Sequence, residues 1–211
     1  MEPQERWTVS WLRHPQLPLC VVHDGDEAVV YVGFSLETRV RFEDLMGFAQ
    51  RHGAVVEERG RSTAATEQLR EYLDGRRREF DLPLRLLGTE FQQRAWAALR
   101  EIPFGEVRSY GQQAARLQQP GASRAVGRAN GQNPISVVVP CHRVVGADGK
   151  LTGFGGGIEA KRWLLELERR GITPSWSPEP GPRRPVERDD QLGLFAGDAS
   201  SSRQPGDRLT P

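Results

Sequence analysis

The chain has 211 residues, of which 37% are hydrophobic and 27% charged, so it can build one or two small domains with modest cores and is not a disordered chain. No apolar run approaches the roughly 20 residues that span a bilayer, and the first dozen residues lack an apolar signal core, so we expect a cytoplasmic protein with no membrane partner. The net charge of +1 excludes a polycation, and nucleic-acid binding therefore requires a local basic patch, which residues 108–128 contain.

The first 86 residues are predicted to form a small α/β domain. Apolar runs on both sides of Asp24-Gly25 are typical of a β-hairpin, and Gly53 and Gly75 stand where helices should end. In chain order, we expect strands at 19–22 and 28–34, a helix at 42–49, a strand at 54–56, a helix at 65–73 and an alternating strand at 80–86.

No catalytic or metal-binding group is predicted in this domain. His14, His23, His52 and Cys20 match no zinc-ligand spacing, so we interpret them as solvated or packed side chains and expect no metal. The chain has only two cysteines, Cys20 and Cys141, which lie far apart, and a disulfide framework is not expected.

The second domain, residues 87–173, is predicted to be mostly helical. Thr89 and Gln92 form a capping box at the start of a helix that Pro103 ends. A second helix begins at Ser109, and after a turn at Pro120-Gly121 a third short helix begins with Ser123 as its cap. Two short helices joined by a tight turn resemble a helix-turn-helix.

A buried strand at residues 135–139 is predicted to deliver Cys141 at its end. A thiol becomes a nucleophile when an adjacent base or positive field favours the thiolate, and His142 and Arg143 are placed to supply this. The local sequence leaves open that Cys141 is simply a buried small hydrophobe.

A glycine-rich loop at 153–157 follows, and then a helix with Ala160, Trp163, Leu164 and Leu167 on one face that should end at Gly171. Residues 174–211 are rich in Pro, Ser, Arg and Asp and are predicted to be a disordered tail.

The motifs between residues 89 and 168 resemble, in order, those of the O6-alkylguanine-DNA alkyltransferase family, the methylated-DNA–protein-cysteine methyltransferases, in its bacterial form. The segment Asn133 to Val145, which contains Pro140-Cys141-His142-Arg143, is similar to the active-site signature. Four further segments match other landmarks: Ser109-Tyr110, Ser123 to Gly127, Gly153 to Gly157, and Lys161 to Glu168. In the N-terminal half the likeness rests on order and length alone.

The resemblance implies an α+β fold, in which a small N-terminal α/β domain precedes a mostly helical C-terminal domain with a winged-helix-like helix-turn-helix and a short strand that carries Cys141. It implies direct-reversal DNA repair, in which an alkyl group moves irreversibly from O6 of guanine to Cys141, once per molecule and without a cofactor. The sequence leaves open whether O4-alkylthymine is also accepted.

Roles carried over from the family assign the chemistry to six side chains. Cys141 attacks the alkyl carbon, His142 takes its proton through a bound water, and Glu168 orients His142. Asn133 braces the turn at the cysteine, Tyr110 donates a hydrogen bond to the leaving guanine, and Lys161 assists near the site.

The resemblance also implies that the third helix enters the minor groove of double-stranded DNA and that the guanine is flipped out. Arg124, next to Ser123, would fill the gap, and small residues keep the contact face slim: Ala125, Gly127, Ala129 and Gly131. Phosphates would be held by Arg108, Arg116 and Arg128. The substrate pocket would be formed by Pro140, Val144, Val145, Phe154, Gly155 and Gly156.

An apolar island lies in the polar tail, with the sequence Gln191-Leu192-Gly193-Leu194-Phe195. It resembles the short peptide with which bacterial polymerases and repair proteins bind the replication sliding clamp. A chance apolar cluster is the alternative, and the two interpretations stay open. Apart from DNA and this clamp we expect no partner, and a monomer in solution.

Three other functions are alternatives to direct repair. A non-catalytic relative that binds alkylated bases and recruits repair factors would lack the reactive cysteine. A helix-turn-helix transcription regulator would carry a dimerisation segment and a polar recognition face, neither of which is found. A cysteine hydrolase would release its product and turn over.

Overall fold

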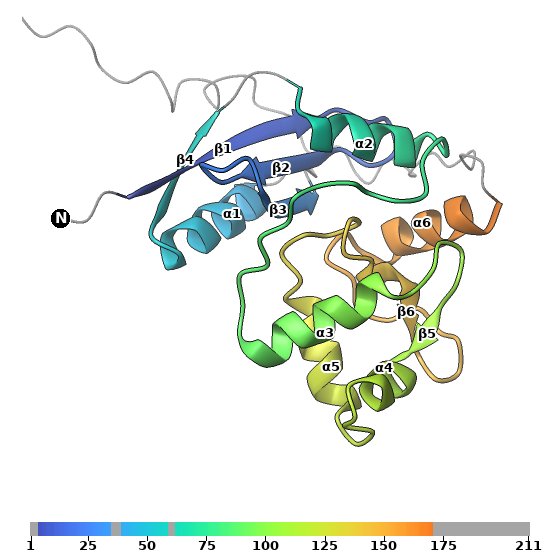
Figure 1. Cartoon of the computed structure of the whole chain (residues 1–211). Helices are drawn as coiled ribbons and strands as arrows, with labels where there is room; N and C mark the ends of the chain where they lie inside the picture. Colours follow the sequence, from blue (N-terminus) through green and yellow to red (C-terminus); the bar gives the residue numbers. More distant parts are fainter. Residues whose placement is uncertain (1–3, 35–38, 59–61, 171–211) are drawn as a thin grey trace, which may run out of the picture. The chain divides into compact units, whose positions relative to one another are not determined.

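The computed structural model describes residues 4–34, 39–58 and 62–170 (Figure 1). These three ranges belong to one unit. No helix within them is both long and apolar enough to cross a membrane. The predicted helix end at Gly171, the tail from residue 174 and its motif at 191–195 lie outside the described residues.

The N-terminal half contains a four-stranded sheet of order β3-β2-β1-β4. Its strands are β1 (Glu5–Leu12), β2 (Leu19–His23), β3 (Val29–Phe34) and β4 (Ala54–Glu58). The pairs β1–β2 and β2–β3 are antiparallel, whereas β1 and β4 are parallel. The predicted hairpin is confirmed, because the Asp24 carboxylate accepts the backbone N–H groups of Asp26 and Ala28 at 3.0 and 2.9 Å and so holds the turn. Strand β1 was not predicted, although its Trp7 and Val9 alternate with polar residues.

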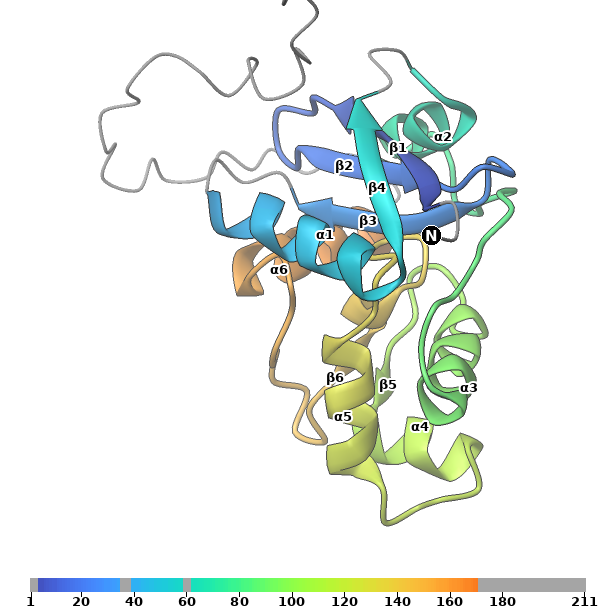
Figure 2. The same cartoon turned by 90° about the vertical axis from the view of Figure 1, so that its left-hand side faces the viewer.

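Two helices cover opposite faces of this sheet, because successive strand residues point to opposite sides. Helix α1 (Arg39–Arg51) packs Leu45 and Ala49 against Trp7 and Val22. Helix α2 (Ala64–Leu73) contributes to the core on the other face, which contains Ala65, Leu69 and Tyr72 together with Leu12, Leu19 and Val21. Figures 1 and 2 show the sheet between α1 and α2. Gly53 and Gly75, which follow the two helices, have φ of +69° and +74°, as the sequence predicted for helix ends.

The predicted strand at 80–86 is wrong. Only one bridge is formed there, between Val29 and Leu84. The Val29 N–H donates to the Pro83 carbonyl at 2.8 Å, and the Arg85 N–H donates to the Val29 carbonyl at 3.0 Å. Since Pro83 has no N–H, it cannot donate to a longer ladder, and the segment remains a connection along the edge of the sheet.

The C-terminal half begins with three helices, α3 (Glu90–Arg100), α4 (Tyr110–Arg116) and α5 (Ser123–Gly131). The predicted capping box of Thr89 and Gln92 is present, and Ser109, which was predicted to begin the next helix, forms a second capping box with Gln112. The predicted cap at Ser123 is wrong: the helix begins one residue earlier than expected, so that Ala122 is the N-cap and has no side-chain cap bond. The Ala122 carbonyl already accepts the Val126 N–H at 2.9 Å, which places Ser123 inside the first turn.

The predicted strand at 135–139 is buried as expected but is not a strand. Its residues form single bridges, from Ile135 to Val32 and from Ser136 to Val139. Val137 has a φ of +72°, outside the extended region, and the Val139 N–H turns back to the Ile135 carbonyl at 2.9 Å. Cys141–Arg143 then form a short 3-10 helix, η1.

Three further elements complete the half. Strand β6 (Val144–Val145) runs parallel to β5 (Arg108–Ser109), and α6 (Ile158–Arg170) follows the glycine-rich loop. The expected α+β fold is confirmed. One apolar core crosses residue 86, because Leu12, Val21 and Tyr72 share it with Val139 and Trp163. The boundary between residues 86 and 87 stays a prediction.

Candidate active site

Cys141 is held at the start of η1 by a tight loop. Cys141 is 8% exposed and follows the buried Pro140. The Asn133 side chain closes the loop from both ends: its Nδ2 donates to the Val139 carbonyl at 2.8 Å and its Oδ1 accepts the Ile135 N–H at 3.0 Å. Asn133 thus lies where a brace of the cysteine turn was predicted.

His142 and Glu168 form a buried pair beside the cysteine. Their residues are 0% and 3% exposed, and His142 Nε2 lies 2.8 Å from Glu168 Oε1. An ionised carboxylate can only accept, so the proton of the neutral imidazole lies on Nε2. Nδ1 is then an acceptor, and it is buried without a hydrogen-bond partner among the described residues. A base with a free lone pair therefore lies next to Cys141 in the chain.

Glu168 also accepts hydrogen bonds from Arg143 and from the backbone. Arg143 Nε lies 3.0 Å from both carboxylate oxygens, its Nη2 is 2.9 Å from Oε1, and its Nη1 donates to the Ile102 carbonyl at 2.6 Å. The Gly105 N–H donates to Oε2 at 2.9 Å. Burial raises the Glu168 pKa, but His142 and Arg143 outweigh burial and lower the pKa to about 2. The carboxylate is therefore charged at neutral pH.

Burial is the largest influence on the pKa values of Cys141 and His142. It raises the pKa of the Cys141 thiol above its usual value, although Asn133 and the Lys161 charge act in the opposite direction. It lowers the pKa of His142 below 6.5, although Glu168 opposes the shift. At neutral pH the resting pair is thus a thiol and a neutral imidazole, and the thiol must lose its proton as it reacts.

Lys161 is completely buried and holds two segments together. Its Nζ donates to the Val144 carbonyl at 2.6 Å and to the Thr152 carbonyl at 2.8 Å. These bonds connect β6 to the start of the glycine-rich loop. The location near the site agrees with the prediction, and the contacts indicate that Lys161 supports the loop.

The loop carries an aromatic wall. The Phe154 ring lies 6.2 Å from the His142 ring and 5.2 Å from the Phe34 ring, centroid to centroid. A Cβ on Gly156 would come within 2.9 Å of Phe34, so this position requires glycine. Of the other predicted pocket residues, Pro140, Val144 and Val145 are buried and Gly155 is exposed.

Tyr110 lies at the start of α4, between the loop and α5. Its hydroxyl is 3.3 Å from Thr152 Oγ1, and a Cβ on Gly127 would lie 3.5 Å from its ring. Gly127 thus faces Tyr110, whereas it was predicted to form part of a slim groove-contacting surface. Tyr110 is half-buried and packs against both adjoining cores.

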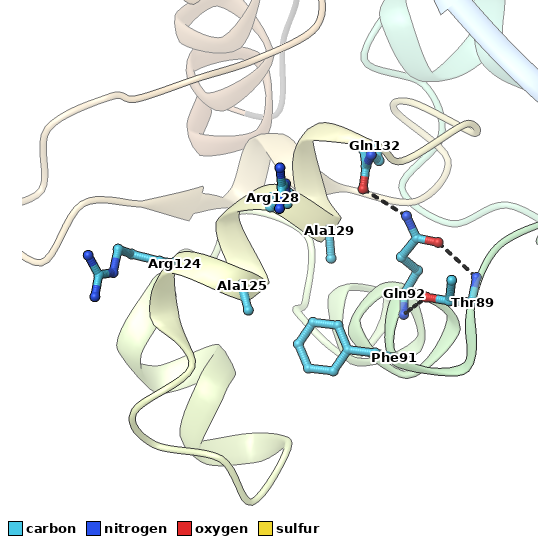
Figure 3. A pocket seen from close by; sticks show the side chains of 8 residues that line it. All are labelled: Thr89, Phe91, Gln92, Arg124, Ala125, Arg128, Ala129 and Gln132. Atoms are coloured by element: carbon cyan, nitrogen blue, oxygen red, sulfur yellow. Dashed lines mark hydrogen bonds between the residues drawn. The ribbon is translucent and has the colours of Figure 1, made fainter.

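The exposed face of α5 consists of Arg124, Ala125, Arg128 and Gly131. Figure 3 shows an open pocket between α5 and α3, lined by Thr89, Phe91, Gln92, Arg124, Ala125, Arg128, Ala129 and Gln132. In this view the Arg124 side chain extends away from the α3 side. The exposed face of α5, which combines two arginines with two small residues, is therefore accessible to a ligand.

The other predicted phosphate contacts are partly occupied. Arg116 Nε lies 2.7 Å from Glu101, and Arg108 donates to the Glu101 carbonyl at 3.1 Å. Both lie near α4, and using them for phosphate binding requires competition with Glu101.

Sequence reasoning missed two buried polar groups. The side-chain amides of Gln113 and Asn130 exchange hydrogen bonds of 2.7 and 3.2 Å, and Gln113 also donates to the Ala95 carbonyl at 3.0 Å, which connects α3, α4 and α5. Tyr72 on α2 donates its hydroxyl to Glu168 Oε1. Its place on the apolar face of a helix gave no signal of a polar role.

Several known proteins are similar in sequence to this chain. The model of the family described as 6-O-methylguanine DNA methyltransferase, DNA binding domain, matches residues 90–170. Methylated-DNA–protein-cysteine methyltransferase of Mycobacterium bovis is 60% identical over 110 residues, which cover 52% of this chain and 67% of the relative. The protein of the same name from Mycobacterium leprae is 53% identical over 118 residues, which cover 56% and 72%.

Solved structures give a similar result over more of the chain. The crystal structure of Mycobacterium tuberculosis OGT in complex with DNA matches with a TM-score of 0.65 and 42% identity, and it covers 79% of this chain and 94% of that one. O6-methylguanine-DNA methyltransferase from Pyrococcus kodakaraensis matches with a TM-score of 0.62 and 27% identity, over 77% and 98%.

Proposed function

The chain belongs to the methylated-DNA–protein-cysteine methyltransferase family, and we infer that it repairs DNA directly, by moving an alkyl group from O6 of guanine onto its own Cys141. The observation that carries this inference is the buried arrangement in which Glu168 fixes the proton of His142 on Nε2 and leaves Nδ1 as an acceptor, on the residue that follows Cys141 in the chain. The Cys141 thiol and the His142 imidazole are both neutral at rest, so the reaction requires the transfer of one proton from the first to the second.

The reaction is a displacement at the alkyl carbon. The Cys141 proton moves to His142 Nδ1 through a bound water as sulfur forms its bond to the alkyl carbon and the bond from that carbon to guanine O6 breaks. Glu168 stays ionised and stabilises the imidazolium, since its pKa lies too low for it to take the proton itself. Tyr110 donates a hydrogen bond to the leaving base, which becomes neutral guanine when the proton held by His142 is passed on to it through water, so that the imidazole is neutral again.

Access to O6 requires the guanine to leave the base stack, at a cost of a few kcal/mol. The slim exposed face of α5 suits a narrow groove, and the exposure of Arg124 on this face supports the proposal that its side chain fills the space of the flipped base. Arg128 on the same face is suited to a phosphate. The DNA complex of the Mycobacterium tuberculosis relative supports DNA as the partner.

The test is a count of lesions repaired per protein chain. A duplex that contains one O6-methylguanine is mixed in molar excess with the protein, and the restored guanine is measured by nucleoside chromatography. We expect repair to rise to one guanine per chain and then stop, with none repaired by Cys141→Ala. Continued turnover would indicate a hydrolytic or other true catalyst, and tight binding with no repair would indicate a non-catalytic relative.

We also propose that Gln191, Leu192, Leu194 and Phe195 bind the bacterial replication clamp. The support is the sequence alone: two leucines and a phenylalanine follow a glutamine within an otherwise polar segment. Sedimentation of the full chain with purified clamp tests this. A complex that is lost in the Leu192→Ala/Phe195→Ala variant and kept in Ser200→Ala is expected, and no complex with the unaltered chain would contradict it.

A further inference from the structure

Cys141, His142 and Glu168 form what we call the relay. We propose that Tyr72 is a positioning residue of this relay: its hydroxyl binds the same Glu168 oxygen as His142 and thereby fixes the ring and the proton of His142. The proposal rests on the function inferred above and extends it to the N-terminal half of the chain. Tyr72 lies on α2, 70 positions before His142 in the sequence.

The contacts place Tyr72 inside the relay. Its residue is 0% exposed, its hydroxyl donates to Glu168 Oε1, and the same hydroxyl lies 3.4 Å from His142 Nε2. His142 Nε2 is itself 2.8 Å from that oxygen. The three polar atoms therefore form a triangle in which Tyr72 and His142 both donate to one carboxylate oxygen.

The Tyr72 ring is buried and packed against two other aromatic rings. Its ring centroid lies 5.1 Å from that of Phe80 and 6.0 Å from that of Phe104, the latter in an edge-on arrangement at 88°. The helix that carries it begins at a capping box formed by Thr63 and Thr66. Burial and the Glu168 charge raise the Tyr72 pKa well above its usual value, so the hydroxyl remains a donor at any working pH.

The charged groups around His142 determine how the Tyr72 hydroxyl affects the pKa of His142. Glu168 is negative, Arg143 and Lys161 are positive, and the Cys141 thiol is neutral in the resting state. Tyr72 is neutral: it holds Glu168 and His142 in position, and its donated bond also lowers the basicity of the carboxylate. Loss of its donated bond makes Glu168 a stronger acceptor, which favours the imidazolium and raises the pKa of His142.

The first test is Tyr72→Phe, which keeps the ring and removes the hydroxyl. The rate constant for alkyl transfer at saturating duplex should fall roughly ten-fold, the size expected for one hydrogen bond to a charged group. The dissociation constant for the lesion duplex should stay unchanged, and the acidic limb of the rate-against-pH profile should move to higher pH. Leu69→Val, on the same helix and equally buried, should reduce stability without moving that limb.

A second variant covers the case in which Tyr72→Phe does not fold. Incorporation of 3-fluorotyrosine at position 72 keeps the hydroxyl and makes it more acidic, so it donates more strongly to Glu168. The acidic limb should then move to lower pH, opposite to the shift of Tyr72→Phe. A limb that stays in place in either folded variant would overturn the proposal and reduce Tyr72 to a packing residue. Failure of the unaltered protein to transfer the alkyl group would instead overturn the proposed function.

Discussion

The relay around Glu168 and the exposed face of α5 meet opposite structural requirements in one molecule. In the relay, Tyr72, His142 and Arg143 direct their donors at one buried carboxylate, so each polar group is placed by several others. On α5, Arg124 and Arg128 are exposed and lie beside small residues. Proton transfer requires fixed geometry away from water, whereas contact with a long anionic ligand requires accessible charge. Damage to the first region should therefore affect the chemical step and stability together, and damage to the second should affect DNA binding and base flipping without altering the chemical step.

The largest effect that separates the regions is expected from Glu168→Gln. This change leaves Arg143 buried without its counter-ion, which should cost about 3 to 5 kcal/mol of unfolding free energy. It also removes the group that stabilises the His142 imidazolium, so the transfer rate should fall by at least about a hundred-fold. Denaturant unfolding and single-turnover repair assays measure both.

Glu166→Gln provides the matched control, since Glu166 lies on the same helix and no ion pair involves it among the described residues. It should behave like the unaltered chain. Equal losses of unfolding free energy and transfer rate in the two variants would show that Glu168 has no specific role in the relay.

The pH dependence of the rate should report His142 alone. Because burial lowers its pKa below 6.5, His142 is neutral above that pH and becomes protonated only as the pH falls further. The transfer rate should stay level down to pH 6.5 and then lose about ten-fold per pH unit once below the lowered pKa. A decline that begins above pH 6.5 would contradict a buried, neutral base.

Arg124→Ala should break the recognition side without touching the relay. Repair of duplex DNA should slow by about ten-fold, because the flipped state loses the side chain that replaces the base. Transfer from a free O6-alkylguanine base, which needs no flipping, should be unaffected. Arg6→Ala, an exposed arginine of the N-terminal sheet, is the control and should leave both rates alone.

The smallest effect is expected from Arg128→Ala. Duplex affinity should fall only a few-fold, and the slope of log affinity against log salt should decrease by about 1, as for loss of one phosphate contact. Binding titrations at several salt concentrations measure this slope. An unchanged slope would remove Arg128 from the DNA interface.

Local signals in the sequence predicted much of the fold. The capping box at Thr89, the helix start at Ser109, the hairpin at Asp24 and the glycines after α1 and α2 act over a few residues, and all are present. Two strand predictions were wrong because an apolar pattern shows that a segment is buried but not that it forms a strand. Residues 135–139 are buried by the surrounding core rather than by a sheet, and Pro83 interrupts the other segment.

The candidate site was predicted where residues are neighbours in a motif and missed where the fold brings them together. Cys141, His142 and Asn133 lie within a short segment, and the likeness to a known family supplied Glu168. Tyr72 could not be predicted, since its pattern on α2 is that of a core residue and only the shared core directs its hydroxyl to Glu168. Arg143 was predicted to act on the thiol, and the structure instead pairs it with Glu168.

The most direct test of the central claim is peptide mass spectrometry after incubation with a duplex that contains one O6-methylguanine. We predict a gain of one methyl mass on the peptide that contains Cys141, saturating at one per chain, and no gain in Cys141→Ala. A methyl group found on another residue, or guanine restored with no gain on the protein, would contradict the account.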